Sequence, residues 1–466
     1  MDQLKRNRAV ELLQRVGDLD PWQDLLFEGV VGEAPSLFLE DFSGIPFLDK
    51  VKGVEWYQLR SRTRAGDGDL FVATQKPVAG YEEYNQRNLG LGSPEFLHAD
   101  VPGANPLCVA EACLQDTSVM ARIKAKAEEK GRLVLHPYMG SDAVWKFARV
   151  LQDQTKADIR VISPIPPAGY AANHKGILTS VIEILLGEEA VCRTVTSTDH
   201  AVLAKAVRDF ASETPALVLK IANYASAMGN QVFDSKDLAS EAEEKILEFE
   251  KSHGWNGKME ILVSEWRVDV LQSPSTQIWI PPLGQGDPRV DGIFEQLLEG
   301  LECVFQGSMP SNLPGELQDE MGRMSLVLAD VFQKVGYVGR CSFDFILCGR
   351  DLSDARPRFV ECNGRWGGTS IPMVLMERIF GKGKTPFYRA RDYVDPALEG
   401  VAFTEICNRL GDSLFDRTTG KGHYILYNVG CLRDFGKFDV IAIGKDREEA
   451  SSRLEEEFPE RILGKL

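Results

Sequence analysis

Polar side chains recur on two neighbouring predicted strands in the last third of the chain. Asp344 lies in the apolar run CSFDFILCG (341–349), and Glu361 and Asn363 lie two apart in PRFVECNGR (357–365). Because side chains alternate between the faces of a strand, Glu361 and Asn363 face one side, and pairing of the strands would bring Asp344 beside them. Carboxylate and amide oxygens are the ligands that Mg²⁺ prefers, with water and phosphates completing its shell. The pattern therefore predicts a magnesium site.

Arg365 lies two residues beyond Asn363 and shares the same predicted face. Its guanidinium fork suits a carboxylate or a phosphate oxygen. A solvated polar face is the alternative, because an E-x-N-x-R pattern often arises by chance. The bulky apolar neighbours Phe343, Phe345 and Phe359 favour coordination, since charges in such surroundings usually bind a partner.

The composition is that of a globular protein. The 466 residues are 44% apolar and 26% charged, which predicts two to four domains of about 100–200 residues each. A formal charge of −16 disfavours nucleic acid and anionic membranes as partners. The nine cysteines are scattered without a C-x-x-C pair, unlike a disulfide framework or a zinc ribbon. We find no signal peptide and no apolar window of about 20 residues, so we expect a cytoplasmic protein without a membrane span.

Strand and helix patterns alternate after the first 45 residues, which look helical and then loop-like. A helix over about 115–130 has Asp116 or Thr117 as its cap and ends at Gly131. A second helix is expected over 139–152, and strands are expected at 56–63, 70–75, 132–138 and 158–164. This alternation predicts a parallel sheet with helices on its faces, a small Rossmann-like α/β unit. It contains no G-x-G-x-x-G turn, so we do not interpret it as a dinucleotide site.

The run GYVGRCSFDFIL followed by RFVECNGRWGGTSIP resembles the two metal-bearing strands of the ATP-grasp superfamily. The resemblance implies that Asp344, Glu361 and Asn363 bind Mg²⁺, for which Mn²⁺ can substitute. It places Arg365 near the reacting carboxylate or acyl phosphate. Arg340 is a further candidate for a phosphate contact, with a solvated turn arginine as the alternative.

The upstream elements of that superfamily occur in the same order here. Lys175, in the sequence NHK that opens a helix, matches the first nucleotide-binding lysine, and Lys220, near the end of a strand, matches the second. Glu265 closes its strand where the hinge between the lobes meets adenine. Any one of these residues alone is more often a surface residue, but the ordered series favours an ATP site.

The polar segment NYASAMGN (223–230) lies where the superfamily places a mobile loop over the γ-phosphate. Ser226 and the backbone amides around Gly229 are its candidate donors to phosphate oxygens.

Within the superfamily, the whole chain is most similar to the pheganomycin-type peptide ligases, which carry an α/β domain ahead of the ATP-grasp lobes. This similarity implies an α/β protein whose ATP-grasp lobes are α+β. The expected parts are an N-terminal extension (1–45), a pre-ATP-grasp α/β domain (46–168), an ATP-grasp N-lobe (169–263), a C-lobe with the metal site (264–384) and a C-terminal α/β unit completing the C-lobe (385–466).

The resemblance implies an ADP-forming carboxylate–amine ligase. Such an enzyme phosphorylates a carboxylate to an acyl phosphate, which an amine of an amino acid or peptide then attacks. We expect a role in natural-product or small-peptide biosynthesis, and a homodimer is one expectation. Two alternatives stay open: a non-catalytic ATP-binding regulatory protein, and an ATP-grasp kinase or carboxylase-like transferase. The sequence has no biotin, lipoyl or phosphohistidine motif, which argues against the carboxylase and dikinase branches.

Overall fold

The computed structural model describes residues 3–46, 48, 51–223, 229–238, 241–255, 257–300 and 303–464. The chain forms two compact units. Unit 1 comprises Met1–Asp20, Pro167–Gln306 and Ser311–Gly364, and unit 2 comprises Pro21–Pro166, Gly307–Pro310 and Arg365–Leu466. The five-part division expected from the sequence is finer than this and stays a prediction.

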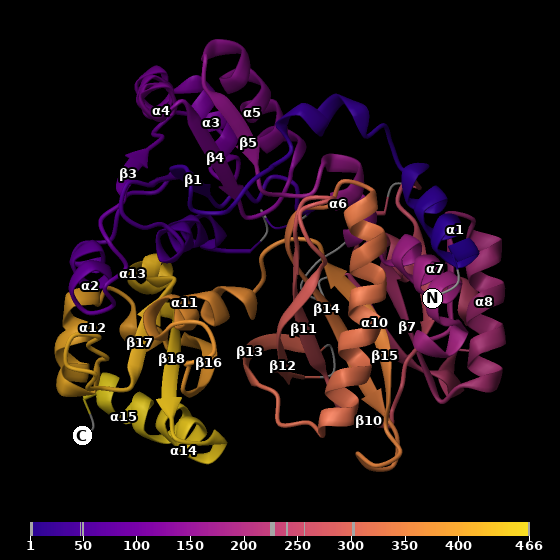
Figure 1. Cartoon of the computed structure of the whole chain (residues 1–466). Coiled ribbons are helices and arrows are strands. Elements are labelled where there is room, and N and C mark those ends of the chain that lie inside the picture. Colours follow the sequence, from indigo (N-terminus) through magenta and orange to yellow (C-terminus); the bar gives the residue numbers. More distant parts are fainter. Residues whose placement is uncertain are drawn as a thin grey trace. The chain divides into compact units, whose positions relative to one another are not determined.

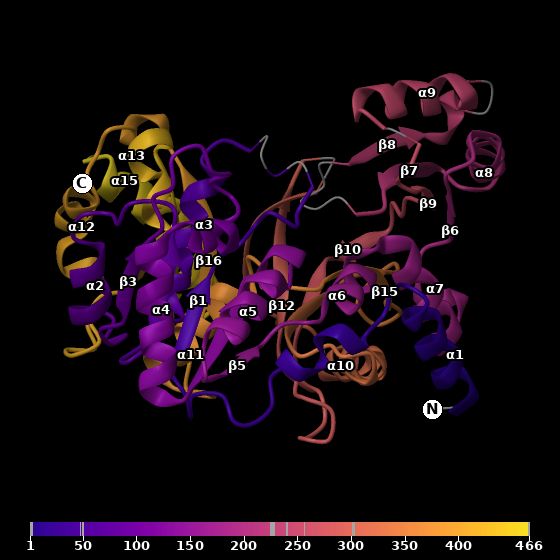
Figure 2. The ribbon, with the colours of Figure 1, turned by 90° about the horizontal axis from the view of Figure 1, so that it is seen from above.

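Unit 2 contains a five-stranded parallel sheet. Its strands are β1 (Ser36–Leu39), β2 (Leu70–Ala73), β3 (Glu95–His98), β4 (Arg132–Pro137) and β5 (Asp158–Val161). They lie in the order β3-β2-β1-β4-β5, so the chain builds outward from β1 on one side and then crosses to the other. The accompanying helices are α2 (Tyr81–Arg87), α3 (Val109–Gln115), α4 (Thr117–Lys130) and α5 (Asp142–Gln154) (Figures 1 and 2). The expected Rossmann-like α/β arrangement is confirmed.

The expected caps of α4 are also seen. The Asp116 side chain accepts hydrogen bonds from the amides of Ser118 and Val119, and Gly131 ends the helix with a positive φ of 70°. A short polar side chain satisfies the first free amides of a helix, and glycine adopts the left-handed conformation without strain.

Two expectations within this part of the chain were wrong. Residues 56–63, expected as a strand, form the 3-10 helix η3 (Val54–Thr63). Its hydroxyl side chains bond to carbonyl groups three residues earlier, Ser61 to Gln58 and Thr63 to Arg60, both at 2.7 Å. Such local bonds compete with strand pairing. In addition, β1 lies within the first 45 residues, which were expected to lack a strand.

The remainder of unit 2 is an antiparallel sheet with short helices. The end of β13 (Val304–Pro310), β16 (Phe387–Val394), β18 (Lys437–Gly444) and β17 (Tyr424–Tyr427) pair in that order. The helices are α11 (Ser370–Phe380), α12 (Phe403–Leu410), α13 (Leu432–Phe435), α14 (Arg447–Ser452) and α15 (Phe458–Ile462). Phe458 is fully buried, with its ring 5.0 Å from that of Tyr424 and 5.2 Å from that of Tyr393. Aromatic packing thus joins α15 to the sheet.

Unit 1 has a four-stranded antiparallel sheet covered by helices. Its strands are β6 (Thr194–Ser197), β9 (Ile261–Glu265), β7 (Ala216–Ile221) and β8 (Asn230–Asp234), in that order. The helices α8 (His200–Glu213) and α9 (Ala242–Ser252) lie beside it (Figure 2). Also in this unit are α1 (Gln3–Gln14), α6 (Pro166–Asn173) and α7 (Lys175–Leu186).

A second sheet of unit 1 has one apolar and one polar face. Its antiparallel strands are β10 (Val270–Gln272), β11 (Pro274–Ile280), β12 (Arg289–Glu299), β14 (Gly339–Cys348) and β15 (Arg356–Asn363). Helix α10 (Gly315–Lys334) covers the apolar face (Figure 1). There the ring of Phe343 lies 6.0 Å from that of Phe332 on α10 and 5.6 Å from that of Phe359. The polar side chains of the same strands point the other way.

Across the described ranges, no helix combines the length and the apolar character needed to cross a bilayer.

The core of the parallel sheet contains a histidine whose titration should affect stability. His136 on β4 is buried beside Phe38, and burial, followed by the positive charge of Arg64, lowers its pKa from 6.5 to about 3. The unfolded chain then binds more protons than the folded chain between these values, so this contribution to stability is present above pH 6.5 and is lost as the pH falls. Because His136 is protonated in the unfolded chain and not in the folded chain, we expect it to lower the free energy of unfolding by ~2 kcal/mol between pH 7 and pH 5.

Urea unfolding at both pH values would measure this cost. His136→Leu, which cannot titrate, should lose ~2 kcal/mol less than the wild type over the same interval. An identical pH dependence in the two proteins would contradict the assignment.

Candidate functional site

The register of β14 and β15 brings the three predicted metal ligands together on the polar face. Asp344 lies directly opposite Glu361, and Ser342 lies opposite Asn363. The Asn363 Nδ2 atom donates to Asp344 Oδ2 at 2.9 Å, which directs the amide oxygen of Asn363 elsewhere. Cys362 pairs with Phe343 and is buried on the apolar face, as expected of a core residue and not of a nucleophile.

A β-bulge lies directly beside this cluster. The register shifts between Asp344 and Phe345, so that Phe345 pairs with Phe359 and Val360 is the extra residue. Strict alternation would put Phe359 and Glu361 on one face, because they are two apart. The extra residue instead allows Phe359 to pack on Phe345, with ring centroids 4.2 Å apart, while Glu361 faces the polar side.

The neighbouring strand β11 supplies two polar residues that the sequence analysis missed. Ser275 lies opposite Asp344, and its Oγ donates to Asp344 Oδ1 at 2.7 Å. Gln277 Nε2 in turn donates to Ser275 Oγ at 3.1 Å. All three side chains are buried. This chain of hydrogen bonds fixes the Asp344 carboxylate, and polar residues at alternate positions of an otherwise apolar strand were the available signal.

Lys175 places an ammonium group against the same cluster. It is the first residue of α7, and its Nζ lies 3.0 Å from Glu361 Oε2. The helix start is held by His174, whose Nδ1 accepts from the amide of Ile177 at 3.2 Å and whose Nε2 lies 3.2 Å from Glu260. Burial lowers the pKa of His174, with Glu260 opposing that change. His174 therefore acts as the N-cap of α7.

Lys220 lies near Lys175. The amide of Lys175 donates to the carbonyl of Ala222 at 3.2 Å, which joins the start of α7 to the end of β7. Burial lowers the pKa of Lys220, the charge of Lys175 lowers it further, and Glu361 acts in the opposite direction. Two ammonium groups and the carboxylate of Glu361 thus occupy one region of unit 1.

The other expected nucleotide-binding positions are less fully defined. Ser226 lies outside the described residues. Gly229 sits at the end of the β7–β8 connection, where its carbonyl accepts from the amide of Ile221 at 3.2 Å. The Glu265 carboxylate pairs with Arg267 Nη1 at 3.0 Å, and its amide donates to the carbonyl of Arg193 at 2.9 Å. Glu265, the last residue of β9, is therefore already held by both its side chain and its backbone.

Arg340 is buried and ion-paired instead of being a solvated turn residue. Its Nη1 lies 2.8 Å from Asp291 Oδ2, and Arg289 Nε lies 2.8 Å from the other oxygen of that carboxylate. Its guanidinium lies 5.5 Å from the ring centroid of Trp279. By strand alternation Arg340 shares the face of Asp344, at the far end of β14.

Arg365 begins the last segment of unit 2, whereas the three oxygen ligands belong to unit 1. The turn between them is docked within unit 1, where the amide of Gly364 donates to Asn173 Oδ1 at 3.0 Å. A Cβ atom at Gly364 would lie 2.8 Å from Asn173 Nδ2 and 2.9 Å from Ala172 Cβ, so only glycine fits without displacement. This packing was not foreseen from the sequence.

The donor set suits a magnesium ion that also contacts phosphate. Within the described ranges, no three or more His, Cys, Asp and Glu side chains are grouped so that they could hold a metal. The cluster offers two carboxylates and one amide, and proteins commonly bind Mg²⁺ through one or two carboxylates together with water and phosphates. Glu361 already lies against a cation, the Lys175 ammonium.

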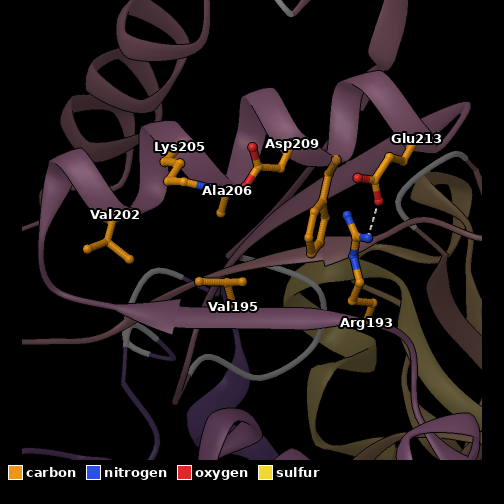
Figure 3. Close-up of a pocket in the computed structure, with 8 residues that line it drawn as sticks. Arg193, Val195, Val202, Lys205, Ala206, Asp209 and Glu213 are labelled. Atoms are coloured by element: carbon orange, nitrogen blue, oxygen red, sulfur yellow. Dashed lines mark hydrogen bonds and ion pairs between the residues drawn. The ribbon is translucent and has the colours of Figure 1, made fainter.

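A hollow of about 410 Å³ elsewhere in unit 1 contains none of the predicted residues. It lies between α8 and β6, and its charged groups are paired with one another, Arg193 with Glu213 and Lys205 with Asp209 (Figure 3). The Arg193 guanidinium also lies 3.9 Å from the ring centroid of Phe210. We assign it no part in the site.

Comparison with known proteins adds to this geometry. Residues 59–152, which run from η3 into α5, match the family model described as the pre-ATP-grasp domain. No curated protein matches the sequence.

Solved structures resemble the chain over nearly its whole length. N5-carboxyaminoimidazole synthetase from Staphylococcus aureus complexed with ADP has a TM-score of 0.54 at 8% identity and covers 93% of this chain and 99% of its own. The biotin carboxylase complex with β-γ-ATP from Campylobacter jejuni has a TM-score of 0.54 at 11% identity, with coverages of 91% and 90%. The biotin carboxylase domain of 2-oxoglutarate carboxylase from Hydrogenobacter thermophilus, bound to MgADP and bicarbonate, has a TM-score of 0.51 at 13% identity, with coverages of 90% and 88%.

The chain has the ATP-grasp fold. Its pre-ATP-grasp domain corresponds to the parallel sheet of unit 2, and the antiparallel sheets follow it along the chain, as the sequence resemblance implied. At these identities the similarity concerns the fold alone, so the roles of the site residues rest on their own geometry.

The proximity of the two lysines gives a direct test of the site. Lys220 should react with an acylating reagent at a lower pH in the wild type than in Lys175→Met, because removal of the neighbouring positive charge raises the pKa of Lys220. Labelling across a pH series, followed by mass spectrometry of the peptide containing Lys220, measures the shift. Lys205→Met on the exposed side of α8 is the matched control and should leave the profile of Lys220 in place. Identical profiles in the wild type and Lys175→Met would show that the two ammonium groups do not interact.

Proposed function

We propose that this protein is an ATP-dependent, ADP-forming ligase that activates a carboxylate as an acyl phosphate and joins it to an amine. The observation that carries the proposal is the cluster in which Asp344, Glu361 and Asn363 meet on one sheet face against the ammonium of Lys175. The ATP-grasp fold supports it, because relatives of that fold are complexed with ADP and MgADP.

In this proposal the cluster holds the metal and the lysines hold the phosphates. When bound, Mg²⁺ supplies positive charge against the phosphate oxygens, with Asp344, Glu361 and Asn363 as its protein ligands; Mn²⁺, which accepts the same oxygen donors, substitutes for it. Lys175 and Lys220 bind phosphate oxygens of ATP and neutralise charge that spreads as the γ-phosphoryl group moves. The pKa of Lys220 is lowered first by burial and then by the positive charge of Lys175, which lies in the same region.

The reaction follows from the poor reactivity of a carboxylate. Its oxygen would have to leave as oxide or hydroxide, which does not occur at neutral pH. Transfer of the γ-phosphoryl group to that oxygen releases ADP and converts the leaving group into phosphate. The amine nitrogen then attacks the acyl carbon, the bond from carbon to phosphate oxygen breaks, and the amine loses a proton. Arg365 is the candidate to orient the carboxylate, and catalysis rests on positioning and charge without a covalent nucleophile.

The substrate class is the finer part of the proposal. The similarity of the sequence to the pheganomycin-type peptide ligases supports an amino acid or peptide as the amine, in natural-product or small-peptide biosynthesis in the cytoplasm. A second candidate is carboxylase-like chemistry, which the similarity in fold to two biotin carboxylases supports. Bicarbonate is itself a carboxylate, and its phosphorylation uses the same charges. The mass of the product separates an amide from a carboxylated amine.

A non-catalytic regulatory role would use the same fold to bind ATP without turnover. ADP release in the presence of an amino-acid panel distinguishes it from a ligase. The ordered hydrogen bonds from Gln277 through Ser275 to Asp344 support the ligase, because a protein that only binds nucleotide need not fix a metal ligand.

The metal ligands should be essential for turnover. Glu361→Gln or Asn363→Ala should reduce ATP-dependent amide formation by ~10²-fold or more, on the scale of losing one key electrostatic group. Product mass spectrometry and ADP release measure the rate, and circular dichroism checks the fold. Glu316→Gln, an exposed carboxylate at the start of α10, is the matched control and should retain full activity. Full turnover in either site variant would overturn the proposal.

Ser275 should influence the metal requirement without contacting the metal. Ser275→Ala removes the donor to Asp344 Oδ1, so the free Mg²⁺ concentration for half-maximal ADP release should rise by ~10-fold or more. Thr276→Val is its control, because the Thr276 hydroxyl lies 2.8 Å from Ser325 on the opposite face. If both variants shifted the magnesium dependence equally, the Ser275 effect would be one of stability alone.

A further inference from the structure

The carboxyl edge of the parallel sheet in unit 2 carries a second cluster of charged residues. The strand order reverses between β1 and β4, which are adjacent in the sheet but separated by β2 and β3 along the chain. Open α/β sheets bind ligands at the carboxyl ends of the strands where the order reverses. Glu40 directly follows β1 and Tyr138 directly follows β4. Helix η3 contacts both, through Arg60 and Arg64.

Arg60, Arg62 and Arg64 alternate along this helix and its C-cap. Arg62 is an example of a buried arginine whose hydrogen-bonding groups all have partners within the protein. Arg62 is 1% exposed, and every nitrogen of its guanidinium has a partner. Its Nε and Nη2 donate to Glu82 at 2.5 and 2.8 Å. Its Nη1 donates to the carbonyl of Ala65 at 3.2 Å, and its Nη2 also donates to that of Gly92 at 2.7 Å. The Arg62 guanidinium therefore needs no ligand to accept its hydrogen bonds.

Arg60 and Arg64 differ from Arg62 in this respect. Each is only 7% exposed, and they share a single fully buried carboxylate, that of Glu40, at 3.6 and 2.6 Å. The Nε atoms of both and the Nη1 of Arg64 are buried without a hydrogen-bond partner among the described residues. A buried donor without a partner costs free energy, so native proteins supply an acceptor, an ordered water or a ligand.

Asp439 is a further acid whose charge acts on Arg60, but no ion pair joins it to either arginine among the described residues. The buried Asp439 carboxyl accepts from Asn428 Nδ2 at 3.0 Å, and burial raises its pKa. His136, beside Arg64, is kept neutral because burial lowers its pKa. Among the described residues, the two guanidinium groups therefore share the carboxylate of Glu40 as their ion-pair partner.

Aromatic rings hold both guanidinium groups without using their N–H groups. The Arg60 guanidinium lies 4.9 Å from the ring centroid of Tyr57 and 5.2 Å from that of Tyr138. The Arg64 guanidinium lies 4.5 Å from the ring centroid of Trp366. Cation–π contacts of this kind position a guanidinium while leaving its edge for an acceptor.

Hydrogen bonds to backbone carbonyl groups connect the surroundings of the arginines to the region that follows the E-x-N-x-R signature. The amide of Trp366, the residue after Arg365, donates to the carbonyl of Tyr138 at 3.0 Å. Arg378 on α11 donates to the carbonyls of Thr63 and Ala65, on either side of Arg64. The backbone that carries Arg64 is thus fixed.

We propose that Arg60 and Arg64 form a receptor for an oxyanion, a carboxylate or a phosphate group, carried by a substrate of this protein. Assignment of that oxyanion to a ligase substrate rests on the proposed function, whereas the binding itself does not. The ligase substrate is then an acid or peptide bearing an anionic group in addition to the groups that react. Glu40 holds the two guanidinium groups side by side and competes with the ligand for them.

Binding to the full-length protein can be measured with simple probes. Malonate, inorganic phosphate, glycylglycine and glycylglycine amide would each be titrated at constant ionic strength, with the thermal unfolding temperature as the readout. We expect saturable stabilisation by an anionic probe and none by the uncharged-terminus amide. A response to phosphate alone identifies a phosphate-bearing substrate, and a response to malonate or glycylglycine alone identifies a carboxylate.

Variants separate a receptor from a purely structural cluster. Arg64→Met and Arg60→Met should weaken probe binding by ~10-fold or more, the effect of losing a charge-assisted hydrogen bond. Arg122→Met, whose exposed ion pair with Glu95 is in the same unit, should bind as the wild type does. If the methionine variants fail to fold by circular dichroism, Arg64→Lys keeps the charge without the fork and should still weaken binding. Glu40→Gln should tighten probe binding in the otherwise wild-type protein, because it removes the carboxylate that competes for the two guanidinium groups.

Absence of saturable binding in the wild type, or equal affinities in the wild type and the folded arginine variants, would overturn the receptor. The ligase assay is read separately. If the wild type forms an amide, Arg64→Met should raise KM for the anionic substrate and leave KM for ATP unchanged. Arginine-dependent probe binding without any turnover would mean that the receptor stands and the proposed ligase fails. Turnover without arginine-dependent probe binding would mean that the proposed ligase stands and the receptor fails.

Discussion

The pairing of β14 with β15 is the constraint on which the candidate site depends. It sets Asp344 opposite Glu361 and puts Asn363 within hydrogen-bonding distance of Asp344. A slip of one residue would move every side chain of β15 to the other face. The apolar face prevents that slip, because Phe343, Phe345 and Phe359 pack together beneath it. The same core that stabilises the sheet therefore holds its oxygen ligands in position.

Charge is distributed differently in the two units. In unit 1, the buried Asp344 carboxylate is held by neutral donors, a hydroxyl and an amide, while Lys175 pairs with Glu361. Neutral donors leave the carboxylate its full charge, which a divalent cation requires. In unit 2, positive charge is in excess, because two buried guanidinium groups share one carboxylate. Each cluster thus presents the charge that complements the ligand proposed for it.

Much of the fold and the centre of the site could be predicted from the sequence. The two-residue spacing of Glu361 and Asn363 sufficed for the shared face, and the caps Asp116 and Gly131 gave the limits of α4. Ser275 escaped notice because its importance depends on which strand lies beside β14, which spacing along the chain does not specify. Helix η3 was mistaken for a strand because the pattern of residue types does not show that Ser61 and Thr63 bond to carbonyl groups three residues earlier, which competes with strand pairing. The docking of Gly364 on Asn173 joins segments far apart in sequence for the same reason.

The bulge at Val360 means that replacement and loss of a residue have different consequences there. A different side chain at 360 leaves the extra residue in place, so Phe359 still faces the core while Glu361 faces the polar side. An in-frame deletion of that single codon would make Phe359 and Glu361 consecutive, and regular alternation would then keep them on opposite faces. What the deletion would remove is the local bend and the additional twist that a bulge gives to its strand, beside Asp344 and Glu361.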